Sequence, residues 1–88
     1  MATVRACSVP GVRMIVYSGD HEPPHLHARK PGHWEAKVYI LEADAAMIQR
    51  VRPPDAKMSR TDRRRIIEGV RSHRLELLVE WEAAQADE

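Results

Sequence analysis

Between residues 12 and 41 the chain alternates apolar and polar side chains in three short runs, each ended by turn residues. A period of two is that of a β-strand with one buried face. The prolines and glycines between the runs exclude a continuous helix, because proline lacks an amide proton and restricts the residue before it. We therefore expect strands at 12–17, 26–30 and 34–41. Three such strands in succession form an antiparallel meander with one apolar face.

The last third of the chain changes to the period of an α-helix. Ser59 has the chemistry of a helix N-cap, and Asp62 stands where a capping box carries an acid. Apolar residues then recur three or four positions apart as one stripe: Ile66, Ile67, Val70, Leu77, Leu78 and Trp81. The pattern predicts one long helix over 59–84, followed by a frayed acidic tail over 85–88.

Residues 42–58 join the two halves. We expect a turn and then a short fourth strand at 47–51, and the prolines at 53 and 54 predict a loop over 52–58. All strands then lie within 3–51. The predicted fold is a single α+β domain over 1–88, in which a small antiparallel meander of three to four strands packs against one long C-terminal helix.

The chain is short, with 88 residues, one cysteine and a formal net charge of +1. This length excludes an enzyme with a separate cofactor domain. No apolar stretch approaches the roughly 20 residues that a membrane-spanning helix needs, and the first residues lack the apolar stretch of a signal peptide. We therefore expect a cytoplasmic protein without membrane contact. A core this small makes a homodimer plausible, since self-association adds stability.

The charge is unevenly distributed. Residues 50–76 hold nine basic and four acidic side chains, whereas 77–88 hold four acidic and no basic ones. At 100° per residue, Arg60, Arg64 and Arg71 fall within about 40° of one another on the predicted helix. This ridge is suited to phosphate contacts, because guanidinium groups bind phosphate through paired hydrogen bonds. The alternative is a solvated helix on which the arginines pair with acids.

Four of the five histidines lie within thirteen residues. His25 and His27 point to the same side of a strand, about 7 Å apart at their Cα atoms. His21 is a candidate third metal ligand, with Asp20 or Glu22 as a nearby carboxylate. Such a set suits Zn, Fe, Mn or Ni as divalent ions. The alternative is a polar strand face whose histidines are exposed or hydrogen-bonded. A histidine-triad hydrolase is excluded, because Arg29 occupies the third alternate position.

The stretch from Val16 to Arg29, with its Glu-Pro-Pro-His-x-His core, resembles domain-of-unknown-function family 4160. The resemblance continues through Glu-Ala-Lys at 35–37 and the ending at 74–81. The motif positions carried over are Glu22, Pro23, Pro24, His25, His27, Glu35 and Lys37. It implies a small bacterial α+β protein of a kind often labelled a transcriptional regulator, sometimes encoded beside another small gene as in toxin–antitoxin pairs. No established reaction comes with it, and residues 42–58 depart from the usual pattern.

Two hypotheses follow. In the first, which the sequence favours, the protein is a non-enzymatic regulatory or interaction module that binds a partner protein or nucleic acid through Arg60, Arg64 and Arg71. In the second, it is a metal-dependent hydrolase or nuclease, with His21, His25 and His27 as ligands and Glu22 or Glu35 as general base. The relation of the histidines to the arginine ridge separates them. A shared groove favours an enzyme or nucleic-acid site, whereas a sheet lying between them makes them separate features.

Overall fold

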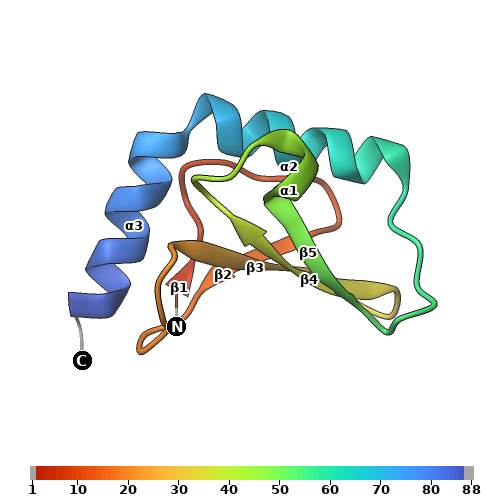
Figure 1. Cartoon of the computed structure of the whole chain (residues 1–88), viewed down its shortest axis with the longest axis horizontal. Helices are drawn as coiled ribbons and strands as arrows, with labels where there is room; N and C mark the ends of the chain where they lie inside the picture. The colour runs from red at the N-terminus through yellow and green to blue at the C-terminus, as the bar shows by residue number, and fades with distance from the viewer. Residues whose placement is uncertain (1, 87–88) are drawn as a thin grey trace.

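A five-stranded antiparallel sheet forms the base of the molecule (Figure 1). The computed structural model describes residues 2–86. The strands follow one another in chain order: β1 (Ala2–Thr3), β2 (Arg13–Val16), β3 (His25–Lys30), β4 (Trp34–Tyr39) and β5 (Ile48–Arg52). The predicted meander is therefore correct, but the sheet has five strands rather than three to four. Strand β1 has two residues, too few for a periodic signal, and it begins one residue before the predicted range of 3–51, while β5 ends one residue after it.

The two faces of the sheet differ in composition. On β3, Leu26 and Ala28 are fully buried, and Ala36 and Val38 stand opposite them on β4. These side chains form the inner face, which packs against the helices. The alternate residues His25, His27 and Arg29 belong to the outer face. The period of two in the sequence thus predicts correctly which side of β3 packs against the helices.

The C-terminal region forms two helices, α2 (Arg60–Ser72) and α3 (Arg74–Ala86), rather than one. His73 interrupts them with φ −127° and ψ 27°, and its ring Nδ1 lies 2.9 Å from the Gly69 carbonyl oxygen. Figure 1 shows α3 turning away from the direction of α2. The predicted tail is partly wrong, because α3 continues to Ala86, while residues 87–88 lie outside the described residues.

The apolar stripe predicted for the helix is confirmed, although the helix bends. Ile66, Val70, Leu77 and Trp81 are all buried in the core. At the start of α2 the Ser59 hydroxyl accepts a hydrogen bond from the Asp62 amide at 3.1 Å, as the N-cap prediction requires. None of the helices within residues 2–86 has the length and apolarity needed to cross a bilayer.

The connection between the halves contains a short helix, α1 (Asp44–Met47), before β5. The prediction of a turn followed by a strand is thus correct in outline. Strand β5 pairs irregularly with β4: Gln49 stands opposite Lys37, but Arg52 stands opposite Glu35. One extra residue on β5 makes a β-bulge, and Arg50 there has a φ of 54°. The bulge sets which side chains of β5 reach the outer face.

Candidate metal centre

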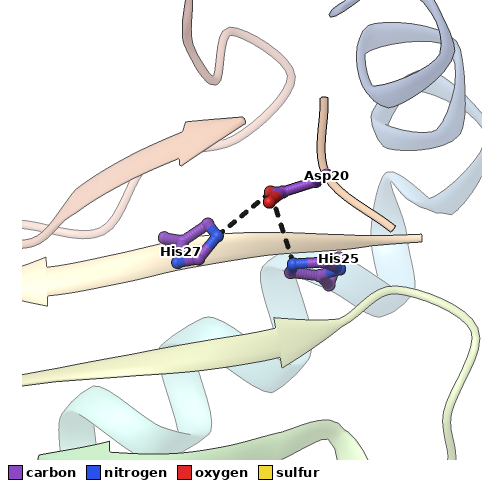
Figure 2. Close-up of side chains that lie close together, drawn as sticks. All are labelled: Asp20, His25 and His27. Carbon is purple, nitrogen blue, oxygen red and sulfur yellow. Dashed lines mark hydrogen bonds and ion pairs between the residues drawn. The ribbon is translucent and has the colours of Figure 1, made fainter. Parts of the chain in front are cut away.

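Two histidine side chains of the outer face meet at the start of β3. His25 stands opposite Tyr39 and His27 opposite Lys37 on β4. Because the residues are two apart on one strand, both rings project to the same side, and their centroids are 5.2 Å apart. Figure 2 shows the two rings on β3 with Asp20 directed toward both.

Asp20 belongs to the turn that follows β2. Its Oδ2 atom lies 3.1 Å from His27 Nε2 and 3.3 Å from His25 Nε2. The three ligand-type atoms all lie within 4.8 Å of one another. Asp20 Oδ2 is thus hydrogen-bonded to His27 Nε2 and also approaches His25 Nε2 without a hydrogen bond (Figure 2).

The protonation of His25 follows from its other nitrogen. His25 Nδ1 lies 2.9 Å from the carbonyl oxygen of Pro23, and since a carbonyl only accepts, Nδ1 must donate. In the neutral ring the lone pair is then on Nε2, which is buried and has no hydrogen-bond partner among the described residues. Its 3.3 Å contact with Asp20 Oδ2 is an electrostatic approach without hydrogen-bond geometry. A lone pair facing a carboxylate oxygen is repelled unless a proton or a metal cation lies between them.

The spacing fits a metal ion. Two ligand atoms about 2.1 Å from one ion, at 90° to 109° to each other, lie about 3.0 to 3.4 Å apart. The separations of Asp20 Oδ2 from the two nitrogens, 3.1 and 3.3 Å, fall in this interval, and the three ligand-type atoms as a set lie within 4.8 Å of one another. The bond from His25 Nδ1 to Pro23 is also the arrangement that orients a metal-binding imidazole, in which the second nitrogen donates to a carbonyl.

The cluster is closed on one side and open on the other. The His25 side chain is only 6% exposed, whereas those of His27 and Asp20 are 28% and 25% exposed. Tyr17 meets the His27 ring edge-on with centroids 4.7 Å apart, and Tyr39 lies 5.4 Å from the His25 ring. The aromatic rings hold the imidazoles in place, while solvent reaches the exposed side.

The structure brings together only part of the ligand set predicted from sequence. His25 and His27 converge, but His21 is exposed and is not in the cluster, where Asp20 takes the third position. Of the two candidate bases, Glu22 is exposed in the turn. Glu35 lies on the outer face of β4 and lines the same hollow as His27.

The arginine ridge lies elsewhere. Arg60, Arg64 and Arg71 belong to α2, which packs on the inner side of the sheet, so the sheet separates them from the histidines. They surround a hollow of about 310 Å³ that also contains Asp44 and Glu68. Arg71 pairs with Asp44 at 3.3 Å. The two features predicted from sequence are therefore distinct sites.

The family described as Domain of unknown function (DUF4160) matches residues 11–82. The chain belongs to this family. The match covers all three residues of the cluster, as well as β2 through β5 and α2. No curated protein and no solved structure matches the chain.

Proposed function

We propose that Asp20, His25 and His27 hold one divalent transition-metal ion and that this DUF4160 protein is a metal-dependent hydrolase. The observation that carries the proposal is the buried Nε2 of His25, which has no hydrogen-bond partner among the described residues and lies 3.3 Å from the Asp20 oxygen; in the neutral ring its lone pair is repelled by that oxygen. A metal cation between these atoms turns that repulsion into attraction. A buried polar atom without a partner otherwise costs about 1 to 3 kcal/mol.

The donor set favours certain ions. Two imidazole nitrogens and one carboxylate oxygen suit Zn²⁺, Fe²⁺, Mn²⁺ or Ni²⁺. Three protein ligands leave coordination positions for water and substrate on the exposed side, as in catalytic rather than structural zinc sites. Such an ion supplies Lewis acidity and lowers the pKa of a water molecule that it binds.

Glu35 is the better candidate for the general base. Glu35 and His27 line one hollow of about 180 Å³ on the outer face. Glu22 is exposed in the turn and lines none of the hollows described on the outer face. In the proposed reaction the Glu35 carboxylate accepts a proton from the attacking water and returns it to the leaving group.

Calorimetric titration of untagged protein with Zn²⁺ and Mn²⁺ tests the site. We expect one ion per chain, and we expect Asp20→Asn and His27→Ala to weaken binding by more than about 100-fold, since each removes a ligand. His21→Ala is the matched control, because this exposed histidine is one residue from Asp20 and should leave the affinity unchanged.

Two results would contradict the proposal. One is equal affinity in Asp20→Asn and the unaltered protein, provided that circular dichroism shows both folded. The other is loss of binding in His21→Ala, which would favour a ligand set centred on the exposed turn. Because both substituted ligands are partly exposed, we expect these variants to fold.

The arginine ridge supports a second candidate function, that of a regulatory or toxin–antitoxin-associated interaction module. Four arginines line its hollow, namely Arg60, Arg63, Arg64 and Arg71. Asp44 and Glu68 in the same hollow offset part of their charge, which favours a partner protein over a polyphosphate. Affinity purification with the unaltered protein and with Arg60→Glu/Arg64→Glu as the two baits tests this candidate. A partner that both baits retain equally would contradict it.

A further inference from the structure

The outer face of the sheet carries a row of cations beside the metal cluster. Arg13, Arg29, Glu35 and Arg52 stand opposite one another in turn, from β2 across to β5. In the next row, Lys37 stands opposite His27. This outer-face row therefore has three arginines, an adjacent lysine and one acid. No ion pair within 4.0 Å involves any of these four cations in the part of the chain that the structure describes.

Two other basic side chains, Lys30 and Arg74, are engaged in contacts that hold the fold together. Lys30 pairs with the buried Asp62 at 3.0 Å. Arg74 donates to the carbonyl oxygens of Ile40 and Glu42 at 2.8 and 2.9 Å. These groups hold the helices on the sheet. The cations of the outer-face row have no such structural partner and remain available to a ligand.

The β-bulge directs Arg52 into this row. In regular pairing, the residue two positions after Gln49 would oppose Glu35, and that residue is Val51. The extra residue places Arg52 there instead. Arg50 adopts its left-handed φ of 54° within the bulge, a conformation that costs a non-glycine residue about 1 kcal/mol or more. The exposed guanidinium of Arg52 thereby joins the outer-face row.

Two hollows meet along the outer-face row. The one of about 180 Å³ is lined by His27, Tyr17 and Lys37, together with the row residues Arg29, Glu35 and Arg52. The other, of about 500 Å³, shares Arg29, Glu35 and Arg52 and extends past the β3–β4 turn to Pro53 and Pro54. A ligand lying along both hollows would contact Arg29, Arg52 and Lys37 and reach His27 at the edge of the cluster.

We infer that the outer face binds the phosphodiester backbone of a single-stranded nucleic acid and that this strand is the substrate; the second part rests on the proposed metal-dependent hydrolase. Arginine binds phosphate oxygens through paired hydrogen bonds. Neighbouring strands lie about 4.8 Å apart, so the outer-face row spans about 14 Å. This length exceeds that of a single phosphate group and suits a chain of them. Tyr17, 37% exposed beside His27, offers a ring on which an unpaired base stacks.

The reaction is hydrolysis of one phosphodiester bond. The water oxygen forms a bond to phosphorus, and the bond from phosphorus to the leaving oxygen breaks. The proton released by the water passes through Glu35 to that leaving oxygen. The products are a phosphate monoester and an alcohol, and no oxidant or reductant takes part.

Fluorescence anisotropy with labelled 12-nucleotide single strands of DNA and RNA, in EDTA, tests binding apart from the metal. We expect Arg29→Ala/Arg52→Ala to weaken binding about tenfold or more and to reduce the slope of log K against log salt by about 2. The matched control is Arg60→Ala/Arg64→Ala, with the same charge change on α2, and it should stay within about twofold. Lys37→Gln gives a second variant that leaves the bulge intact.

The inference is overturned if the outer-face variants bind like the unaltered protein, or if the α2 control loses as much affinity. It is also overturned if inorganic phosphate competes as well as the strand at equal phosphate concentration, or if a duplex binds more tightly. Zn²⁺ titration of Arg29→Ala/Arg52→Ala keeps the two proposals apart. Unchanged metal binding with lost strand binding supports both, whereas an unaltered protein that binds the strand but takes up no Zn²⁺ overturns the assignment of the strand as substrate.

Discussion

Alternate residues of β3 serve opposite purposes. Leu26 and Ala28 face the helices and are fully buried, whereas His25 and His27 face the other way and meet Asp20. The inner face supplies the apolar burial that an 88-residue chain needs. Within residues 2–86 the helices lie on the inner side of the sheet (Figure 1), and the outer face carries the ligand-type atoms and the unpaired cations. Stability and the proposed chemistry are thus divided between two faces of one sheet.

The two groups of arginines differ in the same way. The ridge on α2 shares its hollow with Asp44 and Glu68, and one of its members is paired. The outer-face row has one acid, Glu35, and lies beside the histidine cluster. The distribution of charge along the chain identifies only the arginines of the helix as a binding surface, because they are close together in sequence. The fold brings together a second group that is dispersed from residue 13 to residue 52.

The largest expected effect is a difference in the free energy of unfolding between variants at two adjacent residues of β3. Leu26→Ala removes a fully buried side chain and should lower the free energy of unfolding by about 2 to 5 kcal/mol, through lost burial and a cavity. His27→Ala, on a partly exposed side chain, should lower it by less than about 1 kcal/mol in EDTA, yet abolish metal binding. Urea unfolding in EDTA and metal titration measure the two effects.

The division between the faces fails if these two variants behave alike. A His27→Ala protein as unstable as Leu26→Ala would make the cluster a structural element. Retention of metal binding in His27→Ala would remove this ring from the site.

A smaller effect is expected on the helix side. Gly69 lies inside α2, and a Cβ there would meet Cys7 Sγ at 3.5 Å, an ordinary contact distance. Gly69→Ala should therefore raise the free energy of unfolding by about 0.5 to 1 kcal/mol, because alanine restricts the unfolded chain and favours a helix. Metal affinity should not change. Thermal unfolding in EDTA measures the stability, and metal titration measures the affinity. A less stable variant would show that the Cys7 side chain cannot accommodate the added methyl group.

The smallest expected effect concerns the thiol of Cys7. Burial raises the pKa of this half-buried group, and the carboxylates of Glu80 and Glu76 raise it further. Because the thiolate is the reactive form, alkylation by iodoacetamide should rise with pH at a higher midpoint in the folded chain than in urea. Glu76→Gln, at an exposed position, should lower the folded midpoint. A folded midpoint at or below that in urea would contradict this environment.

Much of the fold was predictable because strand and helix periods are local properties. The period of two identifies the inner face of β4, and the spacing of Ile66, Val70, Leu77 and Trp81 identifies the helical stripe. The bend at His73 was not predictable, since one non-helical residue leaves that spacing readable across both helices. The register of β5 was also not predictable from the sequence, because a bulge is defined only by how the strand pairs with β4.

The site was half predictable for the same reason. His25 and His27 follow from residue spacing on a strand, but a turn has no fixed period, so the sequence predicts His21 as the third ligand and Asp20 or Glu22 only as a nearby carboxylate. The structure brings Asp20 to the rings. The carbonyl of Pro23, which fixes the tautomer of His25, carries no side-chain signal at all.

The nitrogen chemical shifts of the five imidazole rings, followed by NMR as Zn²⁺ is added to untagged protein, test the central claim most directly. The account predicts that Nδ1 of His25 stays protonated throughout, because it donates to Pro23. The Nε2 signals of His25 and His27 should shift together and saturate at one equivalent, while His21, His33 and His73 remain unchanged. Unshifted Nε2 signals at His25 and His27, or a shift of His21 in their place, would contradict a metal centre built from Asp20, His25 and His27.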